Sequence, residues 1–502
     1  MLAWTIYLSF AGALIQALLP KGKNGLARWL ALAVAVAGLA LAVAGFAAGM
    51  GQGRTVLVDL PWVPSMGVHY LLAADGISRV LVLLTGLAAV AGVLFSWDID
   101  LRTNEFFAFF LALIGGVYGV FLSFDLFLLF VFYEIAIVPK YFLISIWGST
   151  RREYAAMKLA LYSFVGSSMV LIGLLAAYAM SGSHSTGLIE LAHAGLPVSF
   201  QMWAFPLVFT GFAILAGMWP FHTWAPTGHV AAPTAASMLL AGVVMKLGAY
   251  GCLRVAISLF PHGLDPWGVS FIGIGSWRDV FAILAVIGIV YGALVALVQT
   301  DFKFVIGYSS VSHMGFVLLG LVTLNQIGMT GAVMQMFSHG ILAGLLFAIV
   351  GRIVYARTHT RQLAELETMH LSKRLPFAAW AFVIAGMASM GLPGFSGFVA
   401  ELQVVVGAWK VQPWWTAATA IGIVISVAYT WRALQKAFFS DVRPTPDDHP
   451  RTGWHDLAPI TWPEYTGVAL LTGVSLFVGL YPRILLDTIE PAVKALLAGG
   501  VQ

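Results

Sequence analysis

The segment FAILAVIGIVYGALVALV, residues 281–298, contains no charged residue. A helix needs about 20 mostly apolar residues to span the hydrocarbon core of a membrane. Comparable runs, separated by turn signals and charge clusters, fill most of the chain, and we count about fourteen of them. Their ranges are 2–19, 27–49, 77–96, 105–122, 124–147, 156–180, 202–223, 231–258, 278–299, 302–322, 328–355, 375–410, 414–438 and 463–485. The sequence therefore predicts an all-α polytopic membrane protein.

The composition agrees with this prediction and excludes several classes of protein. Of the 502 residues, 60% are hydrophobic and 10% are charged, against about 45–50% and about 25% in soluble domains. The mean hydropathy is +0.91. Because so little polar surface is available, the chain must sit in lipid. We therefore expect lipid contacts and no nucleic acid partner, and we exclude a soluble enzyme.

We expect this chain to bind no cofactor and no metal ion of its own. Cys252 is the single cysteine, so the chain cannot supply the four thiolates of an iron–sulfur cluster. We find no dinucleotide-binding glycine motif or phosphate-binding loop in a suitable context, and no zinc motif of the type H-E-x-x-H. The sequence therefore reveals no redox centre and no nucleotide site.

Lysine and arginine are distributed unevenly between the two sides of the predicted helices. The loops after predicted helices 1, 3, 5, 9, 11 and 13 hold Lys21, Lys23, Arg28, Arg102, Arg151, Arg152, Lys303, Arg357, Arg361, Lys373, Arg374, Lys436, Arg443 and Arg451. The opposite side holds Arg54, Arg278, Lys410, Arg483 and Lys494. Cytoplasmic loops carry the excess of positive charge. We therefore expect a multi-pass protein of a bacterial inner membrane with both termini in the periplasm.

Two predicted helices contain segments that break a helix. They are WPFHTWAP, residues 219–226, in the seventh helix and GLPGFSG, residues 391–397, in the twelfth. Proline removes a backbone donor, so each break frees polar groups that must be buried in protein or face a wet cavity. The breaks lie five helices apart, and this odd offset predicts two five-helix repeats of opposite polarity. The predicted divisions are residues 1–104 with helices 1–3, 105–258 with helices 4–8, 278–438 with helices 9–13, and 463–502 with helix 14 and a tail.

Ionisable residues within the apolar runs are the strongest functional signal. They occur in predicted helices 5, 8, 10, 11 and 12 and in the first turn of helix 6. They are Glu134, Lys140, Lys246, His313, His339, Glu401 and Lys158. A charge at the bilayer centre costs about 2.5–3.5 kcal/mol, so these residues need an explanation.

Two interpretations of these residues remain open at this point. In the first, acid–base pairs and histidines only hold the helices together. In the second, they form a row of sites that hold and release protons, joined by water. We find no ring of carboxylates and no backbone filter of the kind that a passive ion channel uses.

Several segments resemble the antiporter-like membrane subunits of respiratory complex I. Their sequences are most similar to the chain M (chain 4) type of NADH–quinone oxidoreductase. The matching segments are PFHTWAPTGHVAAPTAASMLLAGVVMKLGAYG at 220–251, QTDFKFVIGYSSVSHMGFV at 299–317, residues 336–351, and GLPGFSGFVAELQVVVG at 391–407. The resemblance covers roughly residues 70–440.

The resemblance assigns roles to the buried ionisable residues. It implies that Glu134 is the glutamate of an acid–base pair, Lys246 a central lysine and Glu401 the terminal residue, with His313 and His339 between them. It implies proton pumping that is coupled to quinone reduction elsewhere in the complex. It also implies L-type and N-type antiporter-like chains on either side, in a complex that uses NADH, flavin, iron–sulfur clusters and quinone.

The chain departs from the family pattern in the seventh helix. Leu215 stands where the family usually has the lysine that pairs with the glutamate. Lys140 is a candidate replacement, but on an ideal helix a residue six positions after Glu134 points about 240° away. Pro139 could kink the helix and bring Lys140 inward; alternatively, Lys140 extends to the membrane surface. The loop at Pro226 lacks the family's aspartate, and we assign it no proton role.

Three alternatives to a complex I subunit share these motifs or explain the charges. One is a subunit of a multi-subunit sodium/proton antiporter, and another is a subunit of a related membrane-bound hydrogenase. The third is a purely structural role, which predicts that Glu134→Gln and Lys246→Ala assemble normally and leave pumping unchanged.

Overall fold

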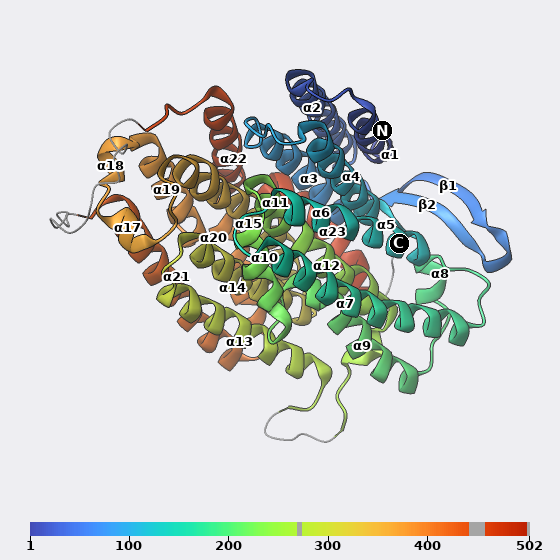
Figure 1. The fold of residues 1–502 in the computed structure, drawn as a ribbon. Helices are drawn as coiled ribbons and strands as arrows, with labels where there is room; N and C mark the ends of the chain where they lie inside the picture. The colour runs from blue at the N-terminus through green and yellow to red at the C-terminus, as the bar shows by residue number, and fades with distance from the viewer. Residues whose placement is uncertain (269–273, 441–456, 499–502) are drawn as a thin grey trace.

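We describe the protein from a computed structural model, in which residues 1–268, 274–440 and 457–498 are placed. The helices form one bundle, from which a β-hairpin projects (Figure 1). Within these residues, twelve helices are long and apolar enough to cross a membrane, and three shorter apolar helices accompany them. The predicted helical membrane fold is confirmed. Two arginines assigned to the cytoplasmic loops, Arg443 and Arg451, lie outside the described residues, as does the end of the predicted tail.

The N-terminal part contains three helices of membrane-spanning length, one of the shorter apolar helices and the hairpin. Its elements are α1 (Ala3–Leu18), α2 (Asn24–Ala48), β1 (Thr55–Val63), η1 (Pro64–Met66), β2 (Val68–Ala74), α3 (Gly76–Leu94) and α4 (Thr103–Leu122). The strands are antiparallel and pair from Thr55 with Ala74 to Val63 with Val68. The sequence did not predict this hairpin, because its residues lie in a connection between apolar runs.

The middle of the chain contains the first broken helix. Its elements are α5 (Leu126–Ile135), α6 (Ile137–Trp147), α7 (Arg152–Ser181), α8 (Leu188–Ala192), α9 (Val198–Ala216), η2 (Phe221–Thr223), α10 (Trp224–Ala231), α11 (Thr234–Leu239), η3 (Leu240–Val244), α12 (Met245–Gly251), η4 (Cys252–Ile257) and η5 (Pro261–Leu264). The predicted break of the seventh helix is confirmed, since α9 ends at Ala216 and regular α-helix resumes at Trp224.

The C-terminal part contains the second broken helix. Its elements are α13 (Trp277–Val298), α14 (Phe302–Val322), α15 (Gln326–Ala348), η6 (Ile349–Val354), α16 (Tyr355–Thr358), α17 (Leu363–Glu367), α18 (Leu371–Arg374), α19 (Pro376–Ser389), α20 (Ser396–Trp409), α21 (Pro413–Phe438), α22 (Trp462–Leu480) and α23 (Arg483–Leu497). The gap between α19 and α20 confirms the predicted break. The predicted tail includes a further helix, α23, which the apolar pattern did not reveal.

The fifth predicted helix is also interrupted. It consists of α5 and α6, which meet at Ala136. Pro139 has no backbone N–H, so the carbonyl of Ile135 loses its partner one turn earlier and the helix breaks there. Glu134 therefore lies at the end of one half-helix and Lys140 lies in the other. The inverted repeat and the divisions drawn from it stay predictions.

The centre of the bundle consists of α3, the continuous helix from α11 to η4, α14 and α15, and nearly all of their residues are buried. α15 packs against α3, α11, α14 and α20. η3, η4 and η6 are π-helical segments, a form that occurs frequently at functional sites. The elements that carry Lys246, His313 and His339 are therefore neighbours inside the protein.

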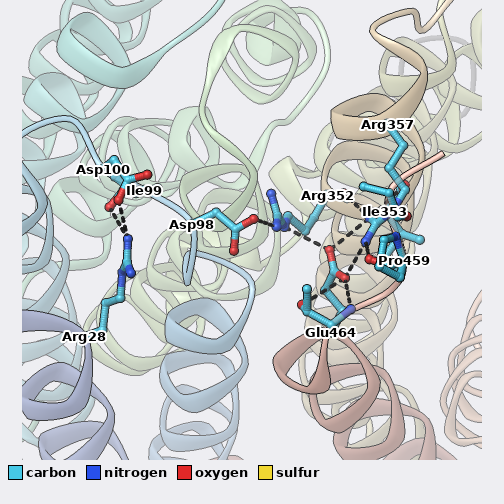
Figure 2. Close-up of polar contacts among 11 residues, drawn as sticks. Arg28, Asp98, Ile99, Asp100, Arg352, Ile353, Arg357, Pro459 and Glu464 are labelled. Carbon is cyan, nitrogen blue, oxygen red and sulfur yellow. Dashed lines mark hydrogen bonds and ion pairs between the residues drawn. The ribbon is translucent and has the colours of Figure 1, made fainter. Parts of the chain in front are cut away.

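Several basic residues lie together on one face, and ion pairs connect the elements that carry them. Arg28 pairs with Asp100, and Arg352 pairs with both Asp98 and Glu464. Figure 2 shows these contacts. We call the face that carries Arg28 and Arg352 the basic face. It corresponds to the side that the distribution of lysine and arginine predicts to be cytoplasmic.

Candidate functional site

Lys246 and His339 are in direct contact at the centre of the bundle. Lys246 Nζ lies 2.7 Å from His339 Nδ1 and also donates a hydrogen bond to the carbonyl oxygen of Ala241. Lys246 comes from α12 and His339 from α15. The side chain of Lys246 is completely buried. Its amine contacts the ring of His339 and a backbone carbonyl instead of water.

Two glycines allow this contact, because they let the helices approach closely. A Cβ atom at Gly340 would lie only 2.7 Å from the carbonyl oxygen of Gly242, which belongs to η3. No side chain fits at that distance without movement of the backbone. The position next to His339 is therefore fixed by the crossing of α15 and η3.

His313 continues the row on the other side of His339. Their ring centroids are 5.5 Å apart. His313 Nδ1 lies 3.1 Å from Glu401 Oε1, and Ser389 Oγ lies 3.3 Å from His313 Nε2. Glu401 lies in α20 just after the second helix break, so the break places its carboxylate against α14 and α15.

Gln335 links the members at this end of the row. Its Nε2 donates to Glu401 Oε1 over 3.4 Å and lies 3.3 Å from His313 Nδ1. A cavity of about 10 Å³ is lined by His313, Gln335, His339 and Glu401 among others, and this is near the smallest space that holds one water molecule. We call Lys246, His339, His313 and Glu401 the central row.

Glu134 and Lys140 lie apart from the central row. Glu134 is half-buried, and its Oε1 has no hydrogen-bond partner among the described residues. Lys140 is 1% exposed, and its Nζ also lacks a partner there. No ion pair joins the two among the described residues, although their charges interact across the break. Because Lys140 is buried, it does not extend to the surface of the chain.

The position of the missing family lysine is filled by packing. Leu215 is buried in α9. A Cβ atom at Gly248 of α12 would meet the backbone carbon of Leu215 at 3.0 Å, so the two helices touch there. α9 therefore contributes an apolar contact at this position, two residues beyond Lys246.

Lys158 is not part of the central row. It is half-exposed on α7, where its amine lies 5.9 Å from the ring of Tyr154 and 6.0 Å from the ring of Tyr162. Its charge acts on His222, a buried residue in the first broken helix. The structure therefore places Lys158 beside the break in the seventh helix.

Two further residues extend the row, and our sequence analysis assigned neither of them a role in it. His229 is buried, its two ring nitrogens have no hydrogen-bond partner among the described residues, and it interacts electrostatically with both Lys246 and Lys303. Lys303 is buried as well, and its Nζ donates to the carbonyl oxygen of Ala232 over 3.1 Å. The sequence analysis counted Lys303 among the loop cations, although the predicted helix 302–322 contained it, and it lies in the first turn of α14. A signal for His229 was present, since it lies in an apolar segment next to the break.

The site consists of proton-binding groups. Among the placed residues, no group of three or more histidine, cysteine, aspartate or glutamate side chains is arranged to hold a metal ion. The central row contains an amine, two imidazoles and a carboxylate in succession. Each of these groups can bind and release a proton.

Comparison with known proteins gives a family. Residues 123–426 match the profile described as NADH:quinone oxidoreductase/Mrp antiporter, TM. The chain is 35% identical over 511 residues to NADH-quinone oxidoreductase subunit M of Rhodobacter capsulatus, covering 98% of this chain and 95% of that protein. The chain belongs to this family.

Solved structures agree with the assignment. A chain of respiratory complex I from Thermus thermophilus with bound NADH superposes with a TM-score of 0.88 and 26% identity, covering 99% of both chains. A chain of the Mrp complex from Dietzia sp. DQ12-45-1b superposes with a TM-score of 0.84 and 22% identity, covering 99% of this chain and 97% of that chain. The second likeness shows the shared fold alone.

Proposed function

We propose that this chain is a proton-translocating membrane-arm subunit of a complex I-type NADH–quinone oxidoreductase. The near full-length similarity to subunit M and the superposition on respiratory complex I support this assignment. The observation that carries the mechanism is the central row, in which groups from α12, α15, α14 and α20 follow one another within the protein.

In this proposal, protons move along the central row between Lys246 and Glu401. The direct contact of Lys246 with His339 and of His313 with Glu401 supplies two of the steps. The small cavity beside the two histidines leaves space for a bridging water between them. Proton exchange along such a row needs only small movements of side chains and water.

Glu134 and Lys140 form a second charged position that acts on the central row. A charge pair about 4 Å apart at an effective dielectric near 20 interacts by roughly 4 kcal/mol. Moving one charge against 100 mV requires about 2.3 kcal/mol. Closing the gap between Glu134 and Lys140 at the break until they form an ion pair would thus release an energy of the size needed to drive one proton transfer.

The proposal also gives the partners and orientation of the chain. The energy comes from quinone reduction in other subunits, which hold flavin, iron–sulfur clusters and the NADH and quinone sites. L-type and N-type antiporter-like chains lie on either side, and lipid covers the remaining surface. The basic face is cytoplasmic and both termini are periplasmic, in a bacterial inner membrane.

Substitution of Lys246 tests the proposed function. In the assembled complex, Lys246→Met and Glu134→Gln should lower proton pumping by about tenfold or more, because a proton-binding group is lost. Lys436→Met removes a lysine from a partly exposed pair with Glu367, so it should leave pumping unchanged. Normal pumping in an assembled Lys246→Met complex would leave only a structural role for the central row.

A second candidate is a subunit of a multi-subunit sodium/proton antiporter. The description of the matched family names the Mrp antiporters as well, and this observation favours the alternative. The two functions predict different partners. Co-purification of this chain with flavin and iron–sulfur subunits supports the complex I assignment, whereas co-purification with small membrane subunits alone supports the antiporter.

A further inference from the structure

A cavity of about 260 Å³ lies at the start of α3, on the face opposite the basic face. α3 ends just before Asp98 on the basic face, so its first residue, Gly76, lies at the other end of the bundle. The loop before β1, the start of α3, η4 and α23 surround the cavity. Its lining includes Gln52, Arg54, Asp75, Arg254, Ala495 and Leu496. The cavity has room for a group much larger than one water molecule.

Arg254 is a buried side chain that has donors to spare beside this cavity. It is 2% exposed, it pairs with Asp75, and its Nε donates to Tyr250 Oη over 3.2 Å. Within the described part of the chain, its Nε and Nη2 make these hydrogen bonds and its Nη1 makes none. A buried donor without an acceptor is costly, so the Nη1 donors need an acceptor in the cavity.

Arg54 brings a second guanidinium to the cavity. It is half-buried, and among the described residues it has no carboxylate partner and no hydrogen bond. Its Cζ lies 5.9 Å from the ring centroid of Phe124, and Arg254 Cζ lies 4.9 Å from the same centroid. One aromatic ring therefore holds both guanidiniums beside the cavity.

Arg79 fixes the loop that carries Arg54. Arg79 is buried in the first turn of α3. It donates to the backbone carbonyls of Gly49, Gln52 and Gly53 and to Thr55 Oγ1. These bonds hold the backbone on both sides of Arg54, so the position of Arg54 beside the cavity is built into the fold.

The charges around the cavity leave a positive excess. Among the described residues that line it, Arg54 and Arg254 are cationic and Asp75 is anionic. The cavity also meets the N-terminus of α3 at Gly76, and a helix N-terminus favours an anion. Two guanidiniums near such an end match a phosphate, because each can donate two parallel hydrogen bonds to its oxygens.

Apolar residues of α23 form the remaining wall of the cavity. Ala492, Ala495 and Leu496 line it, and α23 packs against α3 and α15. Gly76 allows this packing, since a Cβ atom there would overlap the carbonyl oxygen of Thr488. The cavity thus has a cationic wall and an apolar wall, as a phosphate that carries apolar chains requires.

We propose that this cavity binds a phosphate group, which Arg54 and Arg254 hold. The phosphate belongs either to the headgroup of an anionic phospholipid or to free inorganic phosphate. When bound, it joins the loop before β1, the start of α3 and α23 at one point. This inference does not rest on proton transport, since the central row lies elsewhere in the bundle.

Protection of an introduced cysteine tests the site in the assembled complex. Gln52→Cys places a thiol in the lining, and the native Cys252 of this chain is fully buried. Dihexanoyl phosphatidylglycerol or sodium phosphate should slow the reaction of Gln52→Cys with an uncharged maleimide severalfold. Ala498→Cys, at an exposed position just beyond α23, should react equally fast with and without either ligand.

Ala495→Cys is the second lining position if Gln52→Cys fails to assemble. Unchanged labelling of an assembled lining cysteine in the presence of both ligands would overturn the inference.

Two arginines on the same face separate a built site from general surface charge. In the Gln52→Cys chain, Arg54→Gln should raise the ligand concentration that gives half protection about tenfold, because a charged hydrogen bond is lost. Arg483→Gln removes an exposed arginine that does not line the cavity, so it should leave this concentration unchanged. Equal effects of the two substitutions would mean an adventitious anion only and would contradict the proposal.

The two ligands identify the source of the phosphate. Protection by phosphatidylglycerol at concentrations where sodium phosphate gives none supports a phospholipid headgroup, whereas equal protection by sodium phosphate supports free phosphate. Lys246→Met should keep full protection of Gln52→Cys. Failure of the phosphate site and failure of the proposed proton transport are therefore distinguishable.

Discussion

At the scale of single residues, two of the buried lysines, Lys246 and Lys140, have different surroundings. Lys246 contacts His339 and a backbone carbonyl. Lys140 is also buried, yet its amine has no hydrogen-bond partner among the described residues. A buried amine without a partner is costly, so its retention in the fold calls for a functional explanation. The charge interaction between Lys140 and Glu134 provides one.

Replacement of Lys140 separates stability from function. We expect Lys140→Met to leave the thermal stability of the complex unchanged or to raise it by about 1 kcal/mol, because the substitution removes an unpaired buried charge. Pumping should fall severalfold, since Glu134 loses the cation that acts on it. Lys140→Arg should retain part of the activity. Full pumping by Lys140→Met would show that Lys140 does not replace the missing family lysine.

At the scale of elements, the site depends on interruptions and close crossings of helices. The breaks at α5/α6, α9/α10 and α19/α20 lie beside Glu134, His222 and Glu401 respectively. The crossing of α15 and η3 at Gly340 and Gly242 sets the distance between Lys246 and His339. The positions of the titratable groups therefore depend mainly on where the helices break and cross, and less on the side chains around each group.

A substitution at the helix crossing tests this dependence. Gly340→Ala should destabilise the complex by about 1–3 kcal/mol and lower pumping, because the added methyl group pushes α15 away from η3. Gly344→Ala is the matched control one turn along α15, since its Cβ would meet only Leu471 Cδ1 at 4.0 Å. Thermal unfolding and proton pumping measured on both variants decide the outcome. Equal effects at the two glycines would contradict the role of the crossing.

At the scale of the whole molecule, ion pairs on the basic face tie distant parts of the chain together. Glu464 near the C-terminus joins α22 to the end of the helix that carries His339, through Arg352 and Arg357. Arg352 extends the connection to Asp98 after α3. The outer helix α22 is thereby fixed to the centre of the bundle.

Removal of the central carboxylate tests this connection. Glu464→Gln should destabilise the complex by about 3–5 kcal/mol, because two arginines lose a buried partner. Asp100→Asn should change stability by less than about 1 kcal/mol, since its pair with Arg28 is exposed. Thermal unfolding of the two purified complexes provides the measurement. A small effect of Glu464→Gln would mean that α22 is held by apolar packing alone.

The fold was largely predictable because its causes are local. Runs of apolar residues define the membrane helices, and Pro220 and Pro393 mark two of the interruptions. The break at Ala136 was foreseen only as a kink from Pro139. The hairpin β1–β2 and the helix α23 lack a long apolar run, so the same pattern did not reveal them.

The sequence by itself determined that this is a membrane protein with titratable residues in its helices, because the cost of burying charge in lipid makes such residues recognisable one by one. Only the tertiary structure decided which of them meet. It joined Lys246 to His339 and His313 to Glu401, left the Lys140 amine without a hydrogen-bond partner among the residues that are described, and brought His229 and Lys303 close to the row. These contacts depend on the rotation and crossing of helices far apart in the chain, which apolar periodicity does not encode.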